Sequence, residues 1–122
     1  MTWQFTDDRP IYLQLMEQIQ LKIICGQYKA GEKLPSVRDL ASEAAVNPNT
    51  MQKALSELER IGLVFSQRTS GRFITEDSNM VENMREDLAR EQIEKFLNNM
   101  EKIGFGRKEA IALMENIAKE MK

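Results

Sequence analysis

One stretch of the sequence, from Lys33 to Leu58, carries two separate helix start signals. Ser36 can cap a first short helix, with Asp39 three residues later in capping-box register. Asn47 can cap a second helix, and Pro48 then occupies the first helical position, where the backbone needs no N–H donor. The stretch therefore predicts two short helices joined by a tight turn.

The second predicted helix has one apolar face and one polar face. Its apolar residues recur at helical spacing and should face inward, namely Met51, Ala54, Leu55, Leu58 and Ile61. The leading end of the opposite face carries short polar or basic side chains, namely Asn49, Thr50, Gln52 and Lys53. Such a face can exchange hydrogen bonds with base edges in the major groove of DNA. The pattern is typical of a helix-turn-helix DNA-binding motif.

An earlier helix is predicted to begin at Pro10 and to end at Gly26. Trp3 and Phe5 alternate with polar residues before it, which fits either a brief strand or an arm over the core. Cys25, at the end of this helix, is expected to be a small buried residue, because no histidine is present to lower the pKa of its thiol. The helix should pack through an apolar stripe of Tyr12, Leu15, Met16, Ile19 and Ile23.

Gly62 offers a stop for the second helix of the motif, and a hairpin, or wing, is expected after it. Its strands are predicted at Leu63–Gln67 and Arg72–Thr75, around a turn of residues 68–71. Arg68 and Arg72 flank the tip, where they could contact phosphates or enter a minor groove. Alone, each would be read as an ordinary solvated arginine. Their position directly after a helix-turn-helix favours contact with DNA.

The composition narrows the class of function. The 122 residues include no histidine, which removes the commonest general base and metal ligand, so we expect neither an enzyme nor a metal or other cofactor. A single cysteine cannot form an intrachain disulfide, and no apolar run approaches the ~20 residues that cross a bilayer. The N-terminus also lacks the features of a signal peptide. These features indicate a cytoplasmic protein without a membrane partner.

Charge is unevenly distributed, although the formal net charge is only −2. Residues 33–72 carry six basic and four acidic side chains, a local charge of +2, whereas residues 77–122 carry eight basic and ten acidic ones, a local charge of −2. DNA-binding domains are often more basic than this. The mild local excess suits a dimer that reads a specific sequence better than it suits a general coat of DNA.

Residues 77–122 predict two helices separated by a break at residues 104–106. The apolar stripe of the first is too extensive for a helix alone in water, and two helices cannot bury it by themselves. The simplest way to bury this stripe is against a second copy of the chain. Packing between the two helices of one subunit is the other interpretation, and it is compatible with such a dimer. The expected interface residues are Leu88, Ile93, Phe96, Leu97, Met100, Ile103, Met114 and Ile117. The chain is thus predicted to be mainly α with a small β-hairpin, with a DNA-binding domain at 1–76 and a dimerisation domain at 77–122.

Three ordered motifs lie between residues 10 and 75, namely Pro10-Ile11-Tyr12, Leu34-Pro35-Ser36-x-Arg38-x-Leu40-Ala41 and Gly71-x-Phe73-Ile74. With them, this stretch resembles the N-terminal domain of the GntR family of bacterial transcription regulators. The two-helix tail is similar to that of the short-tailed YtrA-type branch. The resemblance implies a winged helix-turn-helix that binds double-stranded operator DNA as a homodimer.

The resemblance also bears on individual residues. Arg38 matches the family's arginine at the start of the second helix, and Gly71 matches its second wing glycine. Thr50 and Gln52 occupy recognition-helix positions. The chain departs from the usual glycine at Thr69 and from the usual arginine at Lys53, so Lys53 is expected to contact a phosphate or a single base. Ser36 is first a helix cap, and contacts a phosphate only if its hydroxyl has hydrogen-bonding capacity left. With the residues argued above, the expected DNA contacts are Ser36, Arg38, Asn49, Thr50, Gln52, Lys53, Arg68, Gly71 and Arg72.

These features predict a sequence-specific transcription regulator, expected to repress, that binds a pseudo-palindromic operator. The short-tailed branch implies control of a transport operon. The tail is too small for an enclosed effector pocket, so an inducer, if there is one, would bind at the dimer interface. The alternative is a helical adaptor that dimerises through its tail and binds other proteins without specific DNA binding.

Overall fold

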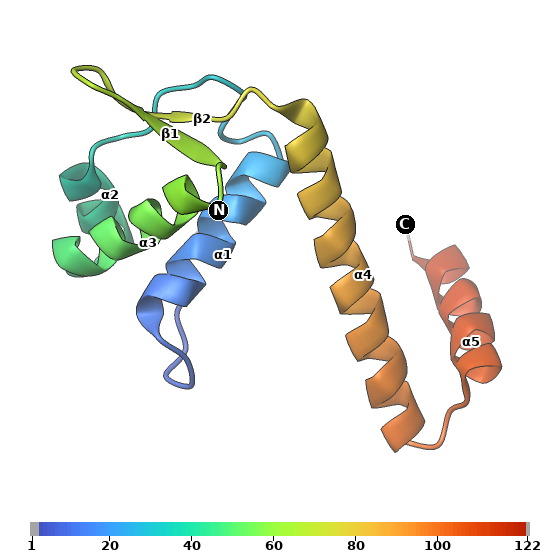
Figure 1. Cartoon of the computed structure of the whole chain (residues 1–122). Helices are drawn as coiled ribbons and strands as arrows, with labels where there is room; N and C mark the ends of the chain where they lie inside the picture. Colours follow the sequence, from blue (N-terminus) through green and yellow to red (C-terminus); the bar gives the residue numbers. More distant parts are fainter. Residues whose placement is uncertain (1–2, 122) are drawn as a thin grey trace. The chain divides into compact units, whose positions relative to one another are not determined.

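The computed structural model describes residues 3–121, which form five helices and one two-stranded antiparallel sheet (Figure 1). The chain divides into two compact units between Asn83 and Met84, inside α4. Within the described residues, no helix combines the length and the apolar character that crossing a membrane requires. The elements are α1 (Ile11–Ile24), α2 (Val37–Ala44), α3 (Pro48–Arg60), β1 (Val64–Gln67), β2 (Gly71–Ile74), α4 (Ser78–Lys102) and α5 (Arg107–Glu120).

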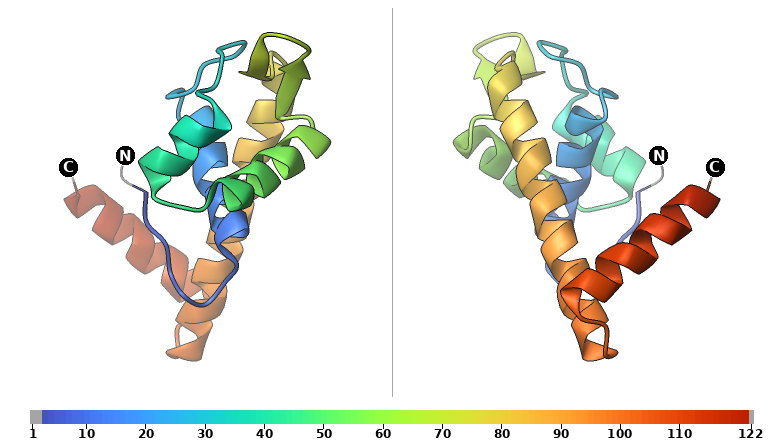
Figure 2. Two further views of the ribbon diagram at one scale, coloured as in Figure 1. Left: turned by 90° about the vertical axis from the view of Figure 1, so that its left-hand side faces the viewer. Right: turned by 90° about the vertical axis from the view of Figure 1, so that its right-hand side faces the viewer.

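Three helices enclose the core of the first unit, with α1 and α2 both packed against α3 (Figures 1 and 2). Leu15 and Ile19 of α1, Leu40 of α2, and Met51 and Leu58 of α3 are completely buried. Full burial of each such side chain contributes about 2 kcal/mol to the stability of the fold. The inward stripes expected from helical spacing are therefore the source of this unit's stability.

Two residues that the sequence assigned to the core lie outside it. Ile61 is 37% exposed, because α3 ends at Arg60 and Ile61 is already its C-cap. The chain reverses at Gly62, whose φ of +89° is open to glycine at little cost. Cys25 is exposed rather than buried, since it is the C-cap of α1, beyond the last helical residue.

The N-terminal segment is an arm along α1 and forms no strand within its described residues. Gln18 accepts a hydrogen bond from the backbone N–H of Gln4 at 3.1 Å and donates to the carbonyl of Gln4 at 2.6 Å. Gln14, which is buried, makes the same pair of bonds with Thr6, at 2.8 and 3.0 Å. Each side-chain amide thus pairs with both the N–H and the carbonyl of one arm residue, as the backbone of a neighbouring β-strand would.

The tip of this arm covers a buried lysine of α1. The Lys22 side chain is only 2% exposed, and its Nζ lies 3.7 Å from the centroid of the Trp3 ring. Its Nζ also lies 3.9 Å from Oε1 of Glu43 in α2, and the Trp3 indole donates to the same oxygen at 3.2 Å. Burial lowers the pKa of Lys22, and the nearby Glu43 carboxylate partly opposes that shift. The arm therefore connects α1 to α2.

The wing forms as predicted, but its first strand is one residue shorter and its second strand is displaced by one residue. Its register pairs Val64 with Ile74 and Gln67 with Gly71. β1 was expected to begin at Leu63, and β2 was expected at 72–75 rather than at Gly71–Ile74. Gly71 joins the ladder because the connection is only three residues long and its φ of +106° suits a glycine. Lys33 adds an isolated bridge to Phe73 on the outer edge of β2.

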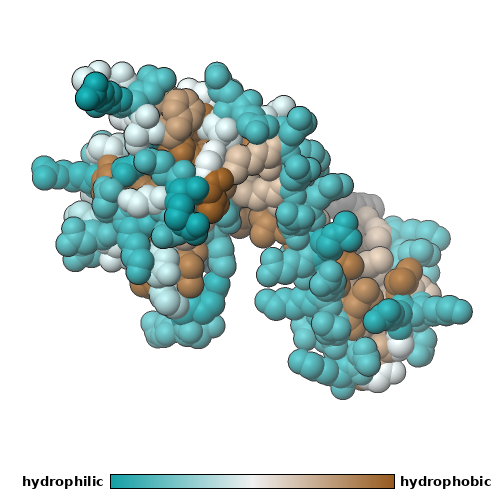
Figure 3. All heavy atoms as spheres, in the orientation of Figure 1, coloured by the Kyte–Doolittle hydropathy of each residue, from teal (hydrophilic) through white to brown (hydrophobic). Residues whose placement is uncertain are grey.

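In the second unit, α4 and α5 form a helical hairpin whose apolar side chains remain at the surface (Figures 2 and 3). Gly104 ends α4 at the predicted break, and the Phe105 N–H bonds to the Met100 carbonyl at 3.0 Å. From Met84 onward, the one fully buried apolar residue among those described is Ala110 of α5. The tail therefore has little core of its own.

Candidate nucleic-acid interface

Local hydrogen bonds fix the two helices of the predicted motif. The Ser36 hydroxyl accepts the backbone N–H of Asp39 at 3.1 Å, which caps α2. The Asn47 side chain accepts the N–H of Asn49 at 2.7 Å and caps α3, whose first residue is proline. Both predicted caps are confirmed. Between the helices, Ala45 adopts a left-handed conformation with φ 57°, which the sequence did not indicate.

The exposed face of α3 carries the predicted base-reading residues. Asn49, Gln52 and Lys53 are exposed and Thr50 is half-buried. The opposite face, from Met51 to Leu58, is buried against α1 and α2. The orientation expected for this helix is therefore confirmed, while the contacts of these side chains with DNA stay a prediction.

Two side chains on that face already have partners within the protein. The Lys53 ammonium lies 4.0 Å from the centroid of the Tyr12 ring in α1. Gln52 donates from Nε2 to the Ser56 hydroxyl at 3.2 Å, one turn further along α3. An exposed cation–π contact contributes about 0.5–1 kcal/mol, so DNA can compete for Lys53 at small cost.

The wing is joined to α3 through one carboxylate. Glu59 of α3 accepts hydrogen bonds at Oε1 from the Ser66 hydroxyl at 2.6 Å and from Arg72 Nε at 3.1 Å. The Ser66 bond is the main reason that the pKa of Glu59 lies below its usual value, and the Arg72 bond and charge add to that effect. Ser66 and Arg72 face each other across the two strands. Glu59 therefore fixes the wing to the last turn of α3, a role that its sequence position did not reveal.

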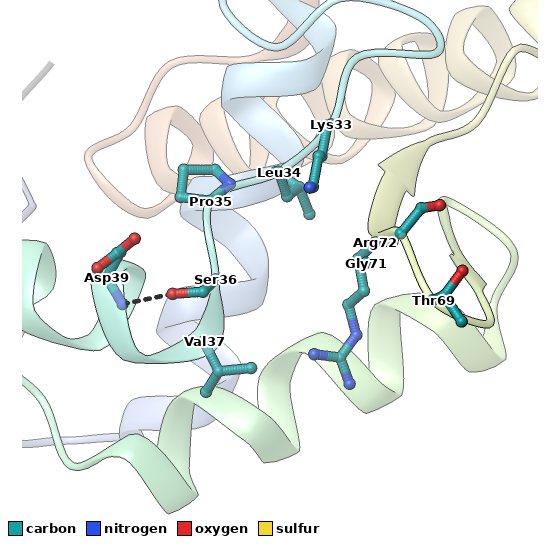
Figure 4. Close-up of a pocket in the computed structure, with 10 residues that line it drawn as sticks. Lys33, Leu34, Pro35, Ser36, Val37, Asp39, Thr69, Gly71 and Arg72 are labelled. Atoms are coloured by element: carbon teal, nitrogen blue, oxygen red, sulfur yellow. Dashed lines mark hydrogen bonds between the residues drawn. The ribbon is translucent and has the colours of Figure 1, made fainter.

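An open cleft of about 760 Å³ separates the wing from the start of α2 (Figure 4). Thr69, Gly71 and Arg72 lie on its wing side, and Ser36 and Val37 lie on its α2 side (Figure 4). Three predicted DNA-contacting residues thus meet here, namely Ser36, Gly71 and Arg72.

Two further predicted contacts are exposed, Arg68 at the wing tip and Arg38 on α2. The described lining of the cleft does not include them. The lining does include Lys33. The sequence analysis counted Lys33 in the local charge but did not name it as an expected DNA contact. Its place directly before the Leu34-Pro35 start of the motif was the available signal.

The predicted interface residues of the tail fall into two groups. Phe96 and Met100 of α4 and Met114 and Ile117 of α5 line a groove of about 260 Å³ between the helices. The other four lie outside that groove, with Leu88 and Leu97 half-buried and Ile93 and Ile103 strongly exposed.

Comparisons with known proteins match the winged-helix unit and, for one relative, most of the chain. The family model described as bacterial regulatory proteins, gntR family, matches residues 11–74, from α1 to the end of β2. An uncharacterized HTH-type transcriptional regulator of Bacillus subtilis, YhcF, is 40% identical over 108 residues, which cover 88% of this chain and 89% of that protein. The HTH-type transcriptional repressor YtrA of Bacillus subtilis is 45% identical over 69 residues, 57% of this chain and 53% of that protein.

Solved structures agree with these relatives. A GntR family transcriptional regulator from Listeria monocytogenes superposes with a TM-score of 0.85 at 38% identity, covering 92% of this chain and 98% of that one. The DNA-binding domain of AraR, solved in complex with operator ORX1, superposes with a TM-score of 0.55 at 27% identity, covering 59% of this chain and 93% of that one.

Proposed function

Because this chain belongs to the gntR family of bacterial regulatory proteins, we propose that it binds operator DNA as a homodimer and represses transcription from the adjoining promoter. It is a transcription regulator of the YtrA type and not an enzyme. One observation carries the proposal: α3 turns a polar face outward beside the wing, while its opposite face is locked in the core.

In the proposed complex, α3 enters the major groove. Asn49, Thr50 and Gln52 read base edges there, because short amide and hydroxyl side chains can donate and accept. Lys53 leaves the Tyr12 ring and contacts a phosphate or a single base. Arg38 and Arg68 hold the DNA backbone or a groove from either side of α3.

The tail is proposed to make the dimer. Residues 1–76 would bind DNA and residues 77–122 would pair with a second copy. Exposed apolar side chains such as Ile93, Ile103 and Met114 would be covered in that pair. A two-fold dimer would present two α3 helices to successive major grooves, about 34 Å apart on the DNA.

Repression follows from occupancy of the promoter, which excludes polymerase. The relative YtrA is named a repressor. Control of a transport operon is a further proposal, which rests only on the resemblance of the two-helix tail to the short-tailed branch. The regulator would act in the cytoplasm. An inducer, if one exists, would bind at the dimer interface and change the angle of the tail helices, and hence the spacing of the two α3 helices.

Titration against a pseudo-palindromic fragment from the gene's own upstream region, at several salt concentrations, tests the proposal. We expect a tight complex that weakens steeply with salt and is abolished by Arg38→Ala. Arg90→Ala removes the same charge from the exposed surface of the tail and is the matched control. Equal binding to a scrambled fragment would contradict the proposal, and a dimer that retards no DNA would favour the adaptor alternative.

A further inference from the structure

Lys33 is held against the wing although it lies far from it in the sequence. Its bridge to Phe73 and the 2.9 Å hydrogen bond from the Leu34 N–H to the Arg72 carbonyl fix its backbone beside β2. Its Cε lies 3.2 Å, and its Nζ 4.0 Å, from the point that a Cβ on Gly71 would occupy. The side chain therefore packs against the wing tip, and glycine at this position leaves room for it.

Arg72, which lies between Gly71 and Phe73 in β2, is held by a different contact. Its side chain is 19% exposed, and its Nε donates to Glu59 at 3.1 Å. Both Lys33 and Arg72 line the cleft between the wing and α2 (Figure 4). The cleft thus receives one cation from the loop before α2 and one from β2, and Glu59 restrains the second.

The chemistry of the cleft fits a phosphodiester. Its lining contains the two bases, the hydroxyls of Ser36, Thr69 and Ser70, and one acid, Asp39. Ammonium, guanidinium and hydroxyl donors are the groups that bind phosphate oxygens in protein–DNA complexes. The single acid leaves an excess of one positive charge among the lining side chains.

We propose that this cleft binds one phosphate of the operator backbone, with Lys33 as a direct contact and Glu59 as a positioning residue for Arg72. The inference rests on the proposed function, since it names a partner group for the same DNA-binding surface. It adds two residues that neither the motif nor the exposed face of α3 indicates.

Replacing Lys33 by glutamine tests the direct contact. The variant should fold normally because Lys33 is exposed. With two copies per dimer and about 0.9 counterion released per phosphate, the slope of log Kobs against log salt should become shallower by about 2. Affinity at 0.1 M salt should fall about 10- to 100-fold, by the same factor for operator and scrambled DNA.

Lys29→Gln is the matched control. It makes the same charge change on an exposed lysine of the same loop, which the described lining of the cleft does not include. Its slope should stay near that of the wild type. Equal slopes for Lys33→Gln and the wild type, or equal changes in both variants, would overturn the inference.

Glu59→Gln tests the positioning role, because the change in charge alone would raise the affinity for DNA, whereas loss of positioning would lower it. Removing an acid near DNA should strengthen binding through general electrostatics. The neutral amide oxygen of glutamine holds Arg72 less strongly than the carboxylate does, and this should instead weaken DNA binding, about fivefold per dimer. Glu57→Gln is the control, since Glu57 lies on the same helix and pairs with Arg60 rather than with the wing. It should leave affinity unchanged or slightly stronger.

A double-variant cycle keeps the positioning test decisive if Glu59→Gln lowers stability. Arg72→Lys retains the charge but cannot bridge Glu59 and a phosphate as a guanidinium can. Its loss of affinity should not add to that of Glu59→Gln. Additive losses, or stronger binding by Glu59→Gln, would overturn the positioning role while wild-type operator binding stands. Failure of the wild type to prefer its operator would instead contradict the proposed function itself.

Discussion

The winged-helix unit and the tail place their apolar side chains in opposite environments. Of the sixteen buried apolar residues described, fifteen precede Met84 and one, Ala110, follows it. In the first unit, stripes on three helices face one another and exclude water. In the tail, Ile93 of α4 is 58% exposed, although it falls on a regular helical stripe. Ile103, which the sequence assigned to the same helix, lies in the turn after Lys102 and is 68% exposed.

The difference separates two sources of stability. The first unit closes its core with its own residues, so its free energy of unfolding should be independent of protein concentration. The apolar side chains that the tail exposes do not stabilise a single chain, because they stay in contact with water. Exposed apolar surfaces of this kind mark sites of association. Stability of the tail should therefore rise with protein concentration, as it does for any state stabilised by binding.

The largest effect should come from a charge placed in the tail groove. Ile117→Glu adds a carboxylate at a side chain that is 46% exposed in the single chain. Two copies buried in a dimer interface, at about 2 kcal/mol each, should raise the dimer dissociation constant about a thousandfold. Sedimentation equilibrium measures this constant directly.

Asn116→Glu adds the same charge at the neighbouring residue of α5, which the described lining of the groove does not include. It should leave the dimer intact. If Ile117→Glu dimerises as tightly as this control, the groove is not part of the interface and the tail needs another explanation.

A deletion in the closed core should behave differently. Leu58→Ala removes a completely buried side chain from α3 and should cost about 3 kcal/mol of unfolding free energy. Denaturant unfolding of the winged-helix unit should show the same loss at low and high protein concentration. A loss that disappears at high concentration would mean that dimerisation, and not this core, holds the unit together.

Much of the closed unit could be predicted because its signals are local. Ser36 and Asn47 cap their helices with their own side chains, and the stripe from Met51 to Leu58 depends only on helical spacing. The position of the wing followed from Gly62 and Gly71. Errors arose at helix ends, where Ile61 and Cys25 lie one residue beyond the regular spacing.

What the sequence could not indicate depends on segments that meet only in three dimensions. Lys33 approaches the wing through a β-bridge, and Glu59 holds Arg72 across 13 positions of sequence. Lys22 would ordinarily be assigned to the surface. It is buried because the arm brings Trp3 over its ammonium group, a contact that helical periodicity does not encode.

That arm should contribute moderately to the closed unit. Trp3→Ala removes the ring over Lys22 and the indole hydrogen bond to Glu43, and should cost about 1.5 kcal/mol. Thermal unfolding measures the loss. Phe5→Ala, in the same arm, removes an aromatic ring without either contact and should cost less. An equal cost would indicate that general coverage of α1, rather than the lysine contact, is what the arm supplies.

The smallest effect should be a gain, at the turn between α2 and α3. Ala45 has φ 57° and ψ 46°, a conformation that costs a residue with a Cβ about 1 kcal/mol. Its N–H and that of Val46 bond to the Ser42 and Ala41 carbonyls, so the helix end holds it there. Glycine would remove the strain but would also gain freedom in the unfolded chain, so Ala45→Gly should stabilise by about 0.5 kcal/mol.

The same change from alanine to glycine one residue earlier should lower the stability instead of raising it. Ala44→Gly changes the last helical residue of α2 and deletes a buried methyl group, so it should destabilise by about 1 kcal/mol. Paired denaturant titrations of the two variants at one protein concentration compare them directly. If Ala45→Gly were instead the less stable, the left-handed turn would not be a site of strain. The closed unit would then hold its most unusual backbone conformation without the cost inferred from its geometry.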